Sequence, residues 1–136
     1  MTGRDAGSLA DFLREEGAPD SVVQGGLEVL LAGWERTVTA VEAGYSGDYE
    51  DYLGDLDGRQ LLAQALERVT RDQAAAVSAR LRELDDRMRA ATRPVARCLW
   101  GMIVADEEGW SPDDNWWYYA RPVSGPPAFL QEFPPA

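Results

Sequence analysis

The feature that most constrains the fold is a stretch from Asp57 to Ala91 that contains no proline and, after Gly58, no glycine. Along it, a stripe of eight side chains, seven of them apolar, recurs at steps of three or four residues: Leu62, Leu66, Val69, Gln73, Val77, Leu81, Leu84 and Met88. Such spacing is typical of a helix with one buried face. The sequence therefore predicts one helix over residues 58–91, about 50 Å long.

A second helical pattern lies before it, over residues 21–43. The linker between them, residues 44–57, contains three glycines, and at its end Asp57 and Gln60 form a capping box that would start the long helix. A linker of this length lets the two helices pack antiparallel. Because the first helix is shorter, we expect the C-terminal segment, or a second copy of the chain, to cover the long helix around Met88.

Two glycines, Gly25 and Gly26, interrupt the pattern of the second helix. Glycine costs about 1 kcal/mol relative to alanine inside a helix. Either another backbone approaches closely at this point, or the helix begins after Gly26. Short helices are also predicted over residues 9–16 and over residues 94–104, the latter after a proline that interrupts the long helix. The apolar face of that last helix would be formed by Val95, Cys98, Leu99, Met102 and Ile103.

An aromatic segment, Asn115–Arg121, reads NWWYYAR, and four consecutive aromatic residues favour an extended chain. Because an extended chain points successive side chains to opposite faces, we expect some of these aromatics to be exposed as a partner-binding patch. In the alternative, they clamp the uncovered half of the long helix. The predicted patch comprises Trp110, Trp116, Trp117, Tyr118 and Tyr119.

The predicted fold is all-α, a helical bundle built on the helix over residues 58–91 packed antiparallel to the helix over residues 21–43. A length of 136 residues is typical of one domain. We place this helical domain at residues 1–121. Residues 122–136 hold five of the eight prolines and are expected to form an extended tail.

The net charge of −11 is unevenly distributed. Residues 1–57 carry three arginines and thirteen carboxylates, residues 58–105 carry nine and five, and residues 106–136 carry one and six, which gives −10, +4 and −5. Either the acidic flanks neutralise the basic centre when they pack on it, or part of the acidic surface remains for a basic partner. Nucleic acid and anionic membranes would be repelled, so neither is expected as a partner.

Few residues are suited to catalysis. The chain has no histidine and a single cysteine, Cys98, so it lacks a Cys–His nucleophile and the ligands of a thiolate or imidazole zinc site. The acidic linker also fails the calcium-loop pattern, because Leu53 and Gln64 take the two essential ligand positions. No catalytic residue, metal site or cofactor is therefore assigned. Cys98 is expected to be a buried packing residue.

The location of the protein is inferred from what the sequence lacks. No apolar run approaches the roughly 20 residues of a membrane-spanning helix, and residues 1–8 lack the apolar core of a secretory signal. One cysteine permits no internal disulfide, which suits a reducing compartment. A cytoplasmic location is therefore expected.

Three hypotheses for the function follow. The preferred one is a small acidic protein–protein interaction protein, immunity-like or antitoxin-like, that binds a basic partner. It would use the aromatic patch together with the acidic residues Asp48, Glu50 and Asp51. The second hypothesis is a structural protein that self-associates as a homo-oligomer through its long helix. The third is a carboxylate-based metal binder or enzyme that uses Asp51, Asp55 and Asp57.

Overall fold

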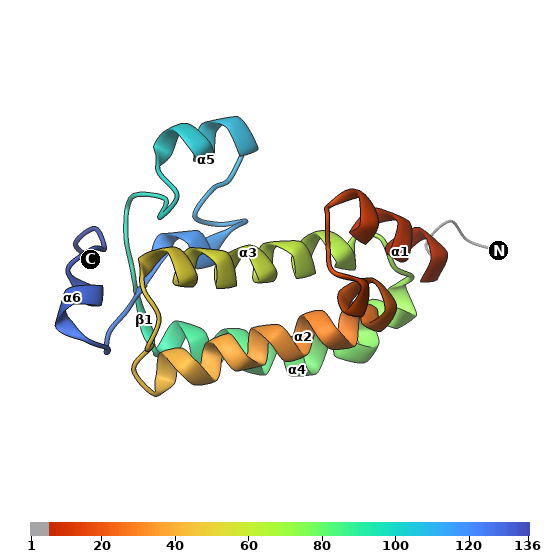
Figure 1. Cartoon of the computed structure of the whole chain (residues 1–136), viewed down its shortest axis with the longest axis horizontal. Helices are drawn as coiled ribbons and strands as arrows, with labels where there is room; N and C mark the ends of the chain where they lie inside the picture. The colour runs from red at the N-terminus through yellow and green to blue at the C-terminus, as the bar shows by residue number, and fades with distance from the viewer. Residues whose placement is uncertain (1–5) are drawn as a thin grey trace.

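The structure, a computed structural model, describes residues 6–136, most of which are helical (Figure 1). The elements follow in the order α1 (Ala6–Glu15), α2 (Asp20–Glu42), α3 (Tyr49–Leu66), α4 (Arg71–Ala90), β1 (Thr92–Pro94), α5 (Met102–Glu108), the 3-10 helix η1 (Trp116–Tyr119), β2 (Ala120–Pro122) and α6 (Pro127–Leu130). Within this range, no helix combines the length and the apolar character that are needed to cross a bilayer.

The predicted all-α bundle is confirmed. Helix α2 packs against α1, α3 and α4, and Figure 1 shows α3 running antiparallel to α2 while α4 returns beside it. The helix predicted over residues 21–43 corresponds to α2, and the one predicted over residues 9–16 to α1. One hydrophobic cluster extends from Leu13 in α1 to Phe133 in the C-terminal tail.

Helix α2 is kinked at Gly26, where φ is 61° and ψ is −137°. Glycine reaches such values without the steric cost that a Cβ atom would add. A Cβ atom placed there would lie 3.4 Å from Cδ2 of Leu9 in α1. Within the described residues, no other backbone approaches these glycines, since the neighbouring atoms are side-chain atoms of Leu9 and Val29. The alternative of a later helix start is partly correct, because α2 begins before Gly26 but is divided there by the kink.

The prediction of one helix over residues 58–91 is wrong, because the chain folds back between α3 and α4. Helix α4 begins at a capping box in which Thr70 Oγ1 accepts from the Gln73 amide (3.1 Å) and Gln73 Oε1 accepts from the Thr70 amide (2.9 Å). Most of the apolar stripe is buried all the same, because both helices pack on α2. Its last residues, Leu84 and Met88, are covered by the chain itself.

Helix α3 starts inside the predicted linker over residues 44–57. Asp48 Oδ1 accepts from the Asp51 amide (2.8 Å), and Asp51 Oδ2 accepts from the Asp48 amide (3.0 Å), so these two residues form the capping box. The capping box predicted at Asp57 and Gln60 is wrong, because both residues lie inside α3. Two glycines do not stop the helix, since its buried side chains contribute more than glycine removes.

Residues 94–104 do not form the predicted helix. Strand β1 pairs antiparallel with β2, and beyond β1 the amides of Val95 and Leu99 donate to the carbonyls of Tyr119 and Tyr118, both at 2.8 Å. Helix α5 begins only after these bonds. The strand was not expected, because its partner lies far along the chain and a single strand has no local sequence signal for that pairing.

The segment Asn115–Arg121 is extended only at its end. Its four aromatic residues form η1, and the chain then enters β2. The tail over residues 122–136 is also extended only in part, since it contains α6. Phe129 and Phe133 of the tail are buried against Tyr52 of α3, with ring centroids 5.9 and 5.4 Å away.

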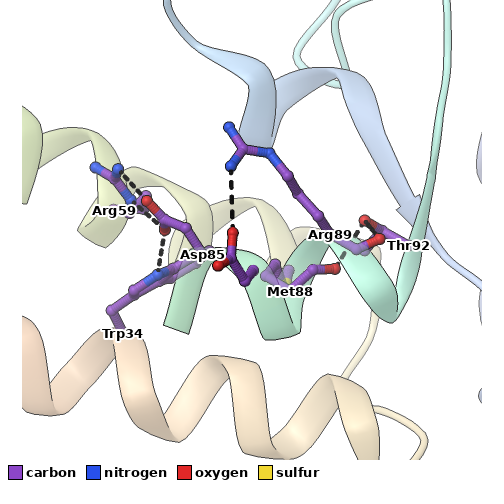
Figure 2. Close-up of polar contacts among 7 residues, drawn as sticks. Trp34, Arg59, Asp85, Met88, Arg89 and Thr92 are labelled. Atoms are coloured by element: carbon purple, nitrogen blue, oxygen red, sulfur yellow. Dashed lines mark hydrogen bonds and ion pairs between the residues drawn. The ribbon is translucent and has the colours of Figure 1, made fainter. Parts of the chain in front are cut away.

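A buried polar network joins three helices (Figure 2). The Asp85 carboxylate of α4 accepts hydrogen bonds from the Trp34 indole of α2 (2.9 Å) and from the Arg59 guanidinium of α3 (3.1 and 2.9 Å). The guanidinium also lies over the ring of Trp117 in η1, 4.2 Å from its centroid. Because all four side chains are buried, the network holds these elements in one relative position.

Candidate functional site

The acidic residues predicted to bind a partner, Asp48, Glu50 and Asp51, are all exposed at the start of α3. Asp48 and Asp51 also stabilise the helix, because they cap it and because carboxylates interact favourably with the positive end of the helix dipole. Among the described residues, the Glu50 carboxylate has no ion-pair partner. This turn of α3 therefore presents negative charge to solvent.

Two further carboxylates of α3 are held by other side chains. Tyr45 donates to Asp55 (2.6 Å), and Asp57 Oδ1 accepts from both the Tyr118 hydroxyl (2.5 Å) and the Trp100 indole (2.9 Å). Burial, and after it these hydrogen bonds, raise the pKa values of Tyr45 and Tyr118 above the ordinary tyrosine value. In the part of the chain that the structure describes, no three carboxylate or thiol groups gather closely enough to hold a metal ion.

Three of the five aromatic residues predicted to form a patch, Trp117, Tyr118 and Tyr119, are buried. Trp110 and Trp116 are half-buried, and Trp110 stacks on Tyr118 with ring centroids 4.1 Å apart. A 3-10 turn does not alternate its side chains between two faces as a strand does, so consecutive aromatics can reach the core. These three residues are therefore not part of an exposed patch. Trp117 and Tyr118 contact α3 through Arg59 and Asp57, and these contacts are not to the second half of the predicted long helix that they were expected to clamp.

The sequence reasoning missed the most exposed apolar side chains of α5 and the turn before it. Trp100, Met102 and Ile103 are 39%, 44% and 77% exposed, whereas the predicted helix over residues 94–104 placed Met102 and Ile103 on its buried face. Figure 1 shows α5 standing apart from the bundle. The sequence signal that could have indicated this exposure is Gly101. Its φ of 100° turns the chain, so that α5 does not continue the direction of the buried residues before it.

Ion pairs between the acidic N-terminal flank and the arginines of the central segment are few. Glu28 pairs with Arg80 (2.7 Å) and Glu42 with Arg87 (2.6 Å), both between α2 and α4. The hydrogen bond from Arg87 lowers the pKa of Glu42. Within the described residues, no carboxylate side chain after residue 105 lies within 4 Å of an arginine nitrogen. Neutralisation of the flanks is therefore partial, and an acidic surface remains.

Two hollows in the bundle differ in their lining. One, of about 600 Å³, lies between α1, α2 and α4 and is lined mainly by apolar side chains. The other, of about 630 Å³, lies between α2 and α3 and contains the carboxylates of Asp51 and Asp55 beside several glycines.

Cys98 is buried, as predicted, and burial raises the pKa of its thiol, which favours the unreactive protonated form.

No protein-family model, no curated protein and no solved structure matches this chain. The function is therefore argued from the surface. That surface combines carboxylates without ion-pair partners, at the start of α3 and on α5, with exposed apolar side chains on α5 and in the turn before it.

Proposed function

We propose that this chain is a protein-binding module whose acidic surface takes a basic protein partner, as an immunity or antitoxin protein would when it masks a basic toxin. The observation that carries the proposal is the unequal use of charge in the fold. Arg59 is buried in an ion pair with Asp85, and Arg80 and Arg87 pair with carboxylates of α2 at the surface of the bundle. Glu50 and the carboxylates of α5 are exposed and have no ion-pair partner among the described residues.

Such a surface acts first through its long-range field. Carboxylates of one sign on a rigid bundle attract a basic protein and orient it before contact, which raises the association rate. Salt screens this attraction, with a Debye length of about 8 Å at physiological ionic strength. The affinity for the partner is therefore expected to fall as salt rises.

The partner is to be identified by affinity purification from the native host, followed by mass spectrometry and reconstitution from purified proteins. Calorimetric titration at about 50 and about 300 mM salt should show a loss of affinity of about tenfold or more. An affinity that does not change between these salt concentrations would overturn the proposal.

A matched pair of variants locates the surface. Glu50→Lys combined with Glu107→Lys reverses two exposed charges near the start of α3 and on α5, and should weaken binding. Glu15→Lys combined with Glu16→Lys makes the same change in net charge at the end of α1, at the other end of the bundle in Figure 1. Equal losses in both double variants would indicate a net-charge effect and no localised surface.

The two other hypotheses have less support in the contacts. Self-association was expected to cover the end of the long helix, but Leu84 and Met88 are buried within one chain. Light scattering at high concentration tests it directly. The carboxylates proposed for metal chemistry are engaged, Asp51 in a helix cap, and Asp55 and Asp57 with tyrosine hydroxyls. A rise in melting temperature with Mg²⁺, Mn²⁺ or Ca²⁺ would restore that hypothesis.

A further inference from the structure

The exposed apolar side chains of this protein are concentrated at one place. In the described residues the exposed large hydrophobic side chains are Trp100, Met102, Ile103 and Val123. We call the first three the α5 knob. Helix α5 stands apart from the bundle (Figure 1) and buries only Ala105. Clustered apolar side chains that the fold leaves uncovered mark an interaction site more often than scattered ones do.

The base of the knob is rigid. The Trp100 indole donates to Asp57 (2.9 Å), which also accepts from the Tyr118 hydroxyl. The preceding carbonyl, that of Leu99, accepts from the Tyr49 hydroxyl (2.8 Å). The only polar group of the Trp100 side chain is thus used within the chain, and its ring remains for apolar contact. An aromatic side chain that is already held in place loses little conformational entropy on binding, which is typical of an interface anchor.

The charges beside the knob are mostly negative. Asp106 follows Met102 by four residues and Glu107 follows Ile103 by four, so each exposed carboxylate lies one helical turn from an exposed apolar side chain, on the same side of α5. Residues 95–114 contain five carboxylates and one arginine. A second copy of the chain would bring these carboxylates against each other, and an anionic membrane would be repelled.

The geometry points to a cationic amphipathic helix of another protein as the occupant of the α5 knob. Its apolar side chains would cover Trp100, Met102 and Ile103, and its Lys or Arg side chains would meet Asp106 and Glu107. This inference rests on the proposed function and deepens it, since it states which part of a basic partner is recognised and where it docks.

The test uses the full chain and two synthetic peptides of about 18 residues. One has leucine and lysine at helical spacing, and the other has the same composition in an order without an apolar face. The first should bind at least about tenfold more tightly than the second, because only its apolar face can bury the knob. Fluorescence anisotropy of labelled peptide measures both affinities.

The decisive variant is Ile103→Asp, which adds one negative charge. Attraction by charge alone would strengthen its binding to the cationic peptide, whereas loss of apolar contact should weaken it about tenfold or more. Val123→Asp makes the same change at the exposed apolar residue outside the knob and should leave binding unchanged. Because Ile103 is so exposed, the melting temperature should not change, and Ile103→Gln provides a second variant should the first be destabilised.

Three outcomes would overturn the inference: equal binding of the two peptides, unchanged binding by both Ile103 variants, or equal losses at Ile103 and Val123. If both peptides bind equally and salt weakens both, the acidic surface acts by charge alone, so the knob is rejected while the proposed function stands. The proposed function itself fails only in the salt titration with the purified partner.

Discussion

Replacing Asp85 by asparagine should remove much of the stability of the bundle. The carboxylate accepts three hydrogen bonds, one from Trp34 and two from Arg59. An asparagine of the same shape would keep an acceptor for Trp34, but its amide group would face the Arg59 guanidinium, donor against donor. Arg59 has a further buried nitrogen, Nη1, without a partner. The substitution therefore leaves a buried cation without its counter-charge.

Breaking a buried ion pair from one side costs about 3–5 kcal/mol, a large part of the 5–15 kcal/mol that is typical of a domain. With a denaturant dependence of about 2 kcal/mol per molar urea, the urea midpoint should fall by about 1.5 M or more. Urea unfolding followed by far-ultraviolet circular dichroism measures this shift.

The neighbouring carboxylate, Asp86, is the matched control. Its side chain is 69% exposed and lies 4.0 Å from Arg89 on the same helix, so Asp86→Asn should change the free energy of unfolding by no more than about 0.5 kcal/mol. Replacing Asp85 by leucine together with Arg59 by methionine should restore part of the lost stability, because no unpaired charge remains, although the buried Trp34 indole loses its acceptor. Equal effects of Asp85→Asn and Asp86→Asn would refute the reasoning.

Three further predictions concern single positions. Tyr118→Phe loses the hydrogen bond to Asp57 and should cost about 1 kcal/mol at neutral pH. Because the pKa of Tyr118 is raised in the folded state, the protonated hydroxyl stabilises the fold fully below about pH 10, and this stabilisation is lost as pH rises further. Above about pH 10 the free energy of unfolding of the variant should therefore fall less steeply than that of the unsubstituted protein, by up to about 1.4 kcal/mol per pH unit. Urea unfolding at several pH values measures both slopes. Gly26→Ala should destabilise by about 1–3 kcal/mol, because φ of 61° with ψ of −137° is a backbone conformation that residues with a Cβ atom avoid. Gly54→Ala, which faces open space inside α3, should stabilise by about 0.5–1 kcal/mol. The reverse order in thermal melts would contradict the assigned backbone. Thr70→Ala removes the cap of α4 and should cost about 1 kcal/mol, and no change in the melting temperature would argue against a helix start at this residue.

Much of the fold was predictable, because helices have local signals. Periodicity correctly indicated an all-α bundle and most of its buried side chains, and it located α2 within one residue at each end. The turn between α3 and α4 was also readable, since Thr70 and Gln73 have the spacing of a capping box. It was missed because an apolar stripe can continue across a turn when both helices bury it against the same neighbour.

The candidate site was less predictable. The exposure of Asp48, Glu50 and Asp51 agrees with what an acidic loop suggests, but the burial of Trp117, Tyr118 and Tyr119 does not follow from their order in the sequence. Their placement depends on hydrogen bonds from the Val95 and Leu99 amides and on the contact of Arg59 with Trp117, all distant in sequence, and on stacking with the nearer Trp110. The exposure of Met102 and Ile103 likewise depends on what the rest of the chain leaves uncovered.

The sequence by itself determined the class of fold and the acidic charge, because helical periodicity follows from residues within one or two turns of one another and the charge follows from composition. Only the tertiary structure decided where the chain turns back, which strand pairs with β1, and which aromatic side chains face the core. The physical reason is that hydrogen bonds between distant segments and the burial of an apolar side chain both require a partner surface, and that surface exists only when the whole chain has folded.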